Sequence, residues 1–248
     1  MCEKIKYGIM VCFFHREIDL FYRNSYSMAI TYIEYSHADG FFGYVVIPRP
    51  VNLVIGNLMI AHVVFLDAVN TSFIASSGWV TIDDYALRYE GIHCATLWKI
   101  ADASDIAASS FTFSGTWRGG ISNKNQGGIY TFSGIDGSNP IGGHNVGSGD
   151  SSYKGSRTCT VGSITPLVAD SMLIFCVFWD AGTNSINNDW AIAVSNPVWG
   201  EKYNVIANNI TVGMACGIRH EVTGTGNGTV TYNNAWANAR FLIVVNPL

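Results

Sequence analysis

Apolar and polar residues alternate along most of the chain with a period of two, which is typical of half-buried β-strands and not of amphipathic helices. The alternation begins at Met28 and recurs to the end of the chain. Residues 98–105 could form a helical turn, but their capping chemistry is weak. The pattern predicts strands at residues 29–35, 44–47, 58–66, 79–82, 93–100, 110–114, 128–132, 157–161, 172–179, 190–194, 211–222, 229–232 and 240–246.

Turn-forming residues separate these predicted strands. Clusters of Gly, Ser, Asn, Asp and Pro lie between them and favour turns over regular structure. Asn227-Gly228 is the clearest turn, because this pair suits the two positive φ values of a type I′ hairpin. Residues 115–127 and 133–156 have the composition of loops, either plain connections or loops that carry specificity. Many strands at short intervals predict a β-sandwich or barrel, with no tandem repeat and no dividing linker.

The first 27 residues differ in charge from the remainder. They hold 7 of the 32 charged residues, and Met28-Ala29 resembles a fresh start that leads directly into a strand pattern. We therefore expect residues 1–27 to be an N-terminal appendage, translated from an upstream start codon, or an arm that packs on a neighbouring subunit. Residues 28–248 form the expected β-sandwich domain.

Composition excludes several classes of protein. The formal net charge is −4 and the chain has no cluster of Lys and Arg, so it lacks the basic surface that nucleic-acid binding requires. The longest uncharged apolar runs fall far short of the roughly 20 residues of a membrane span. Apolar residues make up 48% of the chain, which argues against disorder. The 6 Cys show no CxxC spacing, and we expect buried, reduced thiols.

Motifs that carry enzyme chemistry are mostly missing. We find no GxSxG elbow, no GxxxxGK loop and no HExxH, and no two of the 6 His are two or four residues apart. Asp83-Asp84 is the only adjacent acidic pair, and we expect it to be a solvated turn and not a catalytic dyad. The sequence therefore predicts a protein that is not an enzyme and uses no cofactor.

Two groups of residues are candidates for binding. The loop from Asp180 to Asp189 concentrates oxygen donors of the kind that calcium prefers, although a turn-rich loop without metal explains it as well. Trp117, Trp199 and Trp236 lie beside Gly, Ser or Asn. They are candidate platforms for sugar rings or a partner protein, or else apolar caps over the ends of the sandwich.

The order of several short motifs resembles a family of phage virion β-sandwich proteins whose domains also occur in bacterial surface proteins. The motifs are Asn57-Leu-Met-Ile-Ala, Ser77-Gly-Trp79, Ala95-Thr-Leu-Trp-Lys99-Ile-Ala101, Ser110-Phe-Thr-Phe-Ser114 and Gly128-Ile-Tyr-Thr-Phe-Ser-Gly-Ile-Asp136. The resemblance covers about residues 28–248. Asn57 stands where the family usually has Asp, and residues 138–156 do not align.

Together, the pattern and the resemblance predict a single antiparallel β-sandwich of jelly-roll type. The resemblance implies a non-enzymatic virion structural protein, from a tail, a fibre or a capsid decoration, that is made in the host cytoplasm. Expected partners are copies of the chain, other virion proteins and a surface glycan that the Trp platforms would bind. The alternative is a carbohydrate-binding or adhesive module of a bacterial surface protein.

Overall fold

The computed structural model describes residues 2–4, 10–12, 29–66, 74–87, 92–115, 125–149, 158–180, 191–192, 200–207, 210–220, 222–224, 228–231 and 237–248. In several strands only the backbone is described. These residues form antiparallel strands and, within the described ranges, one short helix, α2 (Ala103–Ala107). The predicted all-β class is therefore confirmed.

The first half of the chain builds two sheets. The larger sheet has five strands, in the order β3 (Thr31–Gly40), β10 (Asn125–Ser133), β5 (Leu58–Leu66), β8 (Ile92–Ile100) and β7 (Val80–Leu87). The smaller sheet has three strands, in the order β4 (Tyr44–Pro48), β9 (Ser110–Ser114) and β6 (Ile74–Ala75).

The second half repeats this arrangement. Its five-stranded sheet has the order β11 (Ile141–Gly149), β18 (Ala237–Val245), β13 (Ser171–Asp180), β16 (Ile210–Arg219) and β15 (Gly200–Ala207). Its three-stranded sheet has the order β12 (Thr158–Val161), β17 (Gly228–Thr231) and β14 (Ala191–Ile192). Each strand number is eight higher than its counterpart, so the repeat that the sequence does not show is present in the topology.

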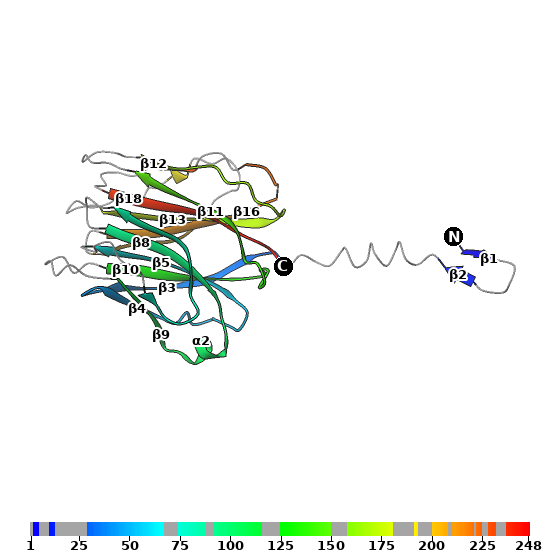
Figure 1. Ribbon diagram of the computed structural model, residues 1–248, viewed down its shortest axis with the longest axis horizontal. Coiled ribbons are helices and arrows are strands. Elements are labelled where there is room, and N and C mark those ends of the chain that lie inside the picture. The colour runs from blue at the N-terminus through cyan, green and yellow to red at the C-terminus, as the bar shows by residue number, and fades with distance from the viewer. Residues whose placement is uncertain are drawn as a thin grey trace.

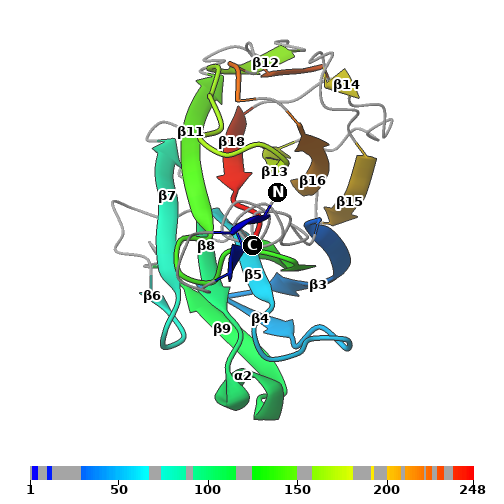
Figure 2. The ribbon, with the colours of Figure 1, turned by 90° about the vertical axis from the view of Figure 1, so that its right-hand side faces the viewer.

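The four sheets lie in layers, with the five-stranded sheets in the middle and the three-stranded sheets on the two outer sides (Figures 1 and 2). One hydrophobic cluster joins the two large sheets through β5, β8 and β10 on one side and β13, β16 and β18 on the other. A second cluster lies between the first large sheet and the β4-β9-β6 sheet. Both faces of the first large sheet therefore pack against an apolar cluster.

Strands β5 and β13 occupy equivalent places in the two halves. Met172 pairs with Val245 and Leu58 with Phe132, each at the same end of the corresponding strand pair. In this alignment Leu58, Ile60 and Val64 of β5 match Met172, Ile174 and Phe178 of β13, and all six side chains enter the shared core. The opposite face of β13 is buried as well, since Leu173, Phe175 and Val177 are 0% exposed.

The predicted strands agree closely with the structure, and three expectations are corrected. The bounds of β5 and β9 are those predicted. The loop predicted at residues 133–156 contains β11, and Asp83-Asp84 lies inside β7 and not in a turn. The cap of α2 is strong, because Asp102 and Asp105 form a reciprocal capping box. In the N-terminal 27 residues the structure describes β1 (Cys2–Lys4) and β2 (Met10–Cys12), which pair antiparallel.

The expected buried thiols are found among the described residues. Cys94, Cys176 and Cys216 are free and buried. Burial raises the pKa of the Cys94 and Cys176 thiols well above the usual range, so both are protonated at neutral pH. They act as small apolar side chains in the shared core.

A hydrogen bond between a histidine and an aspartate joins the two halves at one edge of the large sheets. His144 Nδ1 of β11 lies 2.5 Å from Asp83 Oδ2 of β7. The neighbouring Asp84 pairs with His93, which is buried. Both members of the acidic pair therefore bind a histidine, and Asp83 helps to hold the two halves together.

His62 is buried among apolar side chains in the shared core. It lies beside Gly128 and Thr96 in the sheet, and its ring meets that of Phe241 edge-on, with centroids 5.2 Å apart. Neither ring nitrogen makes a hydrogen bond of normal geometry. Burial lowers the pKa of His62 to about 3, against a weaker opposing effect of the Val177 backbone, so the ring is neutral in the folded chain.

Replacing His62 by leucine should stabilise the chain. The variant His62→Leu removes a buried polar ring without adequate partners, and we expect the free energy of unfolding at pH 7 to rise by about 1–2 kcal/mol. Below pH 6.5 the His62 ring binds a proton in the unfolded wild-type chain, whereas in the folded chain it stays neutral down to about pH 3. Wild type should therefore lose about 1 kcal/mol per pH unit between about 6 and 3 from this group alone, a slope absent from the variant.

Urea unfolding at several pH values measures both effects. The matched control is His93→Leu, because His93 is equally buried but is paired with Asp84. This control should lose stability at pH 7. Equal pH slopes for wild type and His62→Leu would show that His62 titrates normally in the folded chain.

Candidate functional site

The exposed side of the β4-β9-β6 sheet is the most distinctive surface in the described part of the chain. Burial alternates along β4 and β9, so that Val45, Ile47, Phe111 and Phe113 point into the second core. The alternate positions face outward. We call this surface the outer face and define it by Tyr44, Val46, Ile74 and Thr112, of which Ile74 is 63% exposed and Tyr44 is 46% exposed.

The outer face is uncharged and largely apolar. None of the residues of β4, β9 and β6 carries a charge. The strand register places Tyr44 beside Ser114, with Ile74 on the other side of Ser114, and Val46 beside Thr112. Solvent-facing positions of an antiparallel sheet are usually polar, so the apolar side chains of β4 and β6 on either side of the Ser and Thr side chains of β9 are informative.

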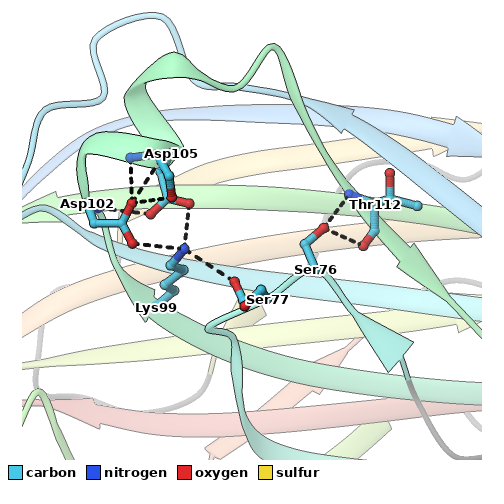
Figure 3. A network of polar contacts seen from close by, with 7 residues as sticks. Ser76, Ser77, Lys99, Asp102, Asp105 and Thr112 are labelled. Carbon is cyan, nitrogen blue, oxygen red and sulfur yellow. Dashed lines mark hydrogen bonds and ion pairs between the residues drawn. The ribbon is translucent and has the colours of Figure 1, made fainter.

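Side-chain hydrogen bonds extend the sheet beyond the short strand β6. The Ser76 hydroxyl donates to the Thr112 carbonyl at 2.9 Å and accepts from the Thr112 backbone N–H at 3.0 Å (Figure 3). The backbone N–H of Ser76 donates to the same carbonyl at 3.1 Å. These bonds fix β6, and therefore Ile74, against β9.

The hairpin turn between β3 and β4 adjoins the outer face and exposes two more aromatic side chains. Phe41 is 52% exposed and Phe42 is 61% exposed. Phe42 and Gly43 have φ values of 54° and 82°, and the Tyr44 N–H donates to the Phe41 carbonyl at 3.3 Å, as in a type I′ turn. Asn, Asp or Gly is favoured at the position of Phe42, because a bulky residue there strains the backbone.

A buried charged cluster holds the corner between β8 and α2. Lys99 Nζ lies 2.7 Å from Asp105 Oδ1 and 3.3 Å from Asp102 Oδ2 (Figure 3). The ammonium also donates to the Ser77 carbonyl at 3.3 Å. Gly78 has a φ of 86°, and a Cβ at this position would lie 2.9 Å from Lys99 Cε. Only glycine therefore suits both the backbone and the close approach of the lysine.

The electrostatics of this corner favour the ion pairs. Burial by itself would lower the pKa of Lys99, but hydrogen bonds and charge attraction to Asp105 and Asp102 outweigh it and raise the pKa. The Ser104 hydroxyl, and then the Asp105 N–H, hold the pKa of Asp102 well below its usual range. Lys99 and Asp102 therefore stay charged near neutral pH. Because these side chains bind one another and the first turn of α2, we interpret the cluster as a structural support.

Residues that carry the family resemblance meet at this corner. Gly78 and Lys99 are in contact, and the Ala101 N–H donates to the Asn57 carbonyl at 2.8 Å. The Asn57 side chain accepts from the Val54 N–H at 3.0 Å, a bond that an aspartate oxygen would also accept. The motifs therefore meet in space, and their contacts support the fold.

Most of the predicted binding residues lie in parts of the chain that the structure does not describe. Trp117, Trp199, Trp236 and Asp189 lie outside the described residues. Asp180 ends β13, where its backbone pairs with Ile210 and Ala237, and its side chain is not described. Among the described residues no group of three or more His, Cys, Asp or Glu could hold a metal ion.

Sequence reasoning missed the outer face, although two signals were present. No charged residue interrupts the run from Tyr44 to Pro48, and its residues are largely apolar. Period-two alternation therefore could not distinguish the buried side of this strand from its exposed side. Phe42-Gly43, in the position of a turn between two strands, was the other signal. An aromatic residue beside the turn glycine departs from ordinary turn chemistry.

Comparisons with protein-family models, with curated proteins and with solved structures gave no match. Within the described ranges, no helix has the length and apolar character needed to cross a bilayer.

Breaking the Lys99 cluster should destabilise the fold. In Lys99→Met the buried Asp105 carboxylate loses its cation, and we expect the free energy of unfolding to fall by about 2–3 kcal/mol. The double variant Lys99→Met with Asp105→Leu should cost less than the two single variants together, because it leaves no buried charge unpaired. Denaturant unfolding of the four chains measures this coupling, and strictly additive losses would show that the two side chains act independently.

Proposed function

We propose that this chain is a non-enzymatic structural protein of a phage virion, a component of a tail, a fibre or a capsid decoration, that assembles with copies of itself and contacts the host surface. It would be made in the host cytoplasm and carried in the virion. The observation that carries the proposal is the uncharged outer face, which presents Tyr44, Val46 and Ile74 to solvent on a rigid sheet. The resemblance of residues 28–248 to virion β-sandwich proteins is the reason for assigning the chain to a phage virion.

We also propose that each half of the chain is a sandwich of jelly-roll type. In the first half the pairs β3 with β10, β4 with β9 and β5 with β8 are nested, as in one long hairpin rolled into two sheets. The second half has the same nesting, with β11 and β18, β12 and β17, and β13 and β16. Nested antiparallel pairing divided between two facing sheets supports the jelly-roll description.

The chemistry of the outer face favours contact with another protein. Soluble monomers seldom expose a continuous apolar surface without a use for it, since such surfaces promote association. Charged residues are depleted at the centres of protein interfaces, where an unpaired charge would lose its hydration. The strands of the outer face meet this requirement because they contain no charged residue.

One observation favours the second candidate, a carbohydrate-binding or adhesive module. Phe41, Phe42 and Tyr44 are exposed aromatic residues on one hairpin. Aromatic rings can stack on the apolar faces of sugars, so the same hairpin could take a glycan. This candidate requires a specific sugar ligand, whereas the structural protein requires only protein partners.

The two candidates differ in where the chain is found. If the proposal holds, mass spectrometry of purified phage particles from the source that encodes the chain will detect it at many copies per particle. A chain absent from the particles but present in a bacterial envelope fraction would overturn the proposal.

A glycan array with the full chain is the complementary measurement, with Phe41→Ala as the variant and Leu167→Ala as an exposed apolar control elsewhere. Sugar binding that only Phe41→Ala abolishes would favour the adhesive module.

A further inference from the structure

We infer that two copies of this chain associate face to face through the outer face, related by a twofold axis, with the Phe41–Phe42 turn at the rim of the contact. The inference rests on the proposed function and adds the partner, a second copy, and the surface that binds it.

The edges of the β4-β9-β6 sheet are poorly suited to pairing with another strand. The edge strand β6 has 2 residues, and the other edge strand, β4, ends at Pro48, which has no N–H to donate. Short edge strands and proline are common means of blocking edge-to-edge pairing. The apolar side chains of Tyr44, Val46 and Ile74 project from the face, which is not blocked. Association through this sheet should therefore pack face on face.

The exposed apolar area matches what a stable dimer requires. An aromatic side chain presents roughly 150–250 Å², so the exposed parts of Phe41, Phe42 and Tyr44 supply roughly 300 Å². Val46 and Ile74 are 40% and 63% exposed and enlarge this area. A standard interface buries about 800 Å² on each partner, of which a little over half is apolar. The outer face and its hairpin turn together supply the apolar part of such a contact.

The lack of charge favours a second copy over a charged partner. A basic or acidic partner would find no ion pair on β4, β9 or β6 to replace the hydration that its own charges lose on binding. A second outer face is neutral and offers the same combination of apolar side chains with Ser and Thr hydroxyls. The shared core already shows that two equivalent sheets of this fold pack face to face. Twofold pairing of identical surfaces is the commonest form of self-association.

Phe42 indicates that the turn has a use beyond folding. Its φ of 54° is the conformation that a type I′ turn demands, and asparagine would adopt it with less strain. The side chain is 61% exposed, so most of its apolar surface is available for contact with another chain. Burial of the Phe42 ring in the dimer would offset the strain in the turn and explain why a phenylalanine occupies this position.

Sedimentation velocity of the full chain over a wide concentration range tests the inference. Wild type should approach twice the 27.0 kDa chain mass. Val46→Lys places a charge at the centre of the contact, twice by symmetry, and should weaken the dimer by roughly 100-fold. The control Leu167→Lys adds the same charge at a 77% exposed apolar residue away from this sheet and should leave the dimer unchanged.

A second variant separates assembly from folding. Phe42→Asn should weaken the dimer by roughly 10-fold. It should also raise the thermal midpoint by a few degrees when wild type and variant are compared at a dilution where both are monomeric, because the turn is relieved of strain. A folding defect in Val46→Lys, visible by circular dichroism, would leave Phe42→Asn as the decisive variant.

Three results would overturn the inference: a wild-type chain that stays monomeric, an assembly larger than a dimer, or equal effects of Val46→Lys and Leu167→Lys. The failures of the two proposals can be told apart. A monomeric chain that is nevertheless found in phage particles would remove only the dimer, whereas a dimer of a chain that is absent from particles would remove only the virion role.

Discussion

The rest of the structure depends on the burial of both faces of the central strands. Along β5 the side chains of Leu58, Ile60 and Val64 enter the shared core, while Met59, Ala61 and Val63 enter the second core. A strand with water on one side needs only every second residue to be apolar, but β5 needs nearly all of them. Because a sheet with two apolar faces requires a cover on each, this constraint leads directly to four layers, with the three-stranded sheets on the outside.

The repeated topology shows how two sequences that differ can meet the same constraint. At equivalent positions β5 has His62 beside Gly128, and β13 has Cys176 beside Phe241. One half thus pairs a large side chain with a glycine, and the other pairs a small one with a phenylalanine. The rings of His62 and Phe241 meet across the shared core. The large side chain of each sheet therefore fills the space beside the small residue of the other sheet. Core volume is retained while residue identity is not, which explains why no repeat is visible in the sequence.

Strand positions were predictable because alternation and apolar runs are local signals. The bounds of β5 follow from one unbroken apolar run, and those of β9 from the alternation of Phe111 and Phe113 with Ser and Thr. In contrast, β11 is rich in Gly and was interpreted as loop, because its strand conformation depends on pairing with β18, about a hundred residues away. The layers could not be predicted for the same reason: pairs such as β3 with β10 join distant segments, and local patterns do not specify them. At the candidate site, the exposed aromatic turn could be predicted from Phe42-Gly43, whereas the direction of each side chain of β4 could not be predicted.

The absence of charge from the outer face is significant when compared with the places where charged residues do occur in the fold. Charged side chains of the described residues are not avoided in general: Lys99 and Asp105 are buried as a pair, and Asp83 and Asp84 each bind a histidine. These groups lie at corners and sheet edges, where a partner of opposite charge offsets the loss of hydration. The strands of the outer face face water, where a lone lysine or glutamate would cost nothing, yet they carry none. Solubility alone would favour charges there. An uncharged face on a rigid sheet is favoured when water is to be displaced from it, which is the physical basis of the self-association proposed above.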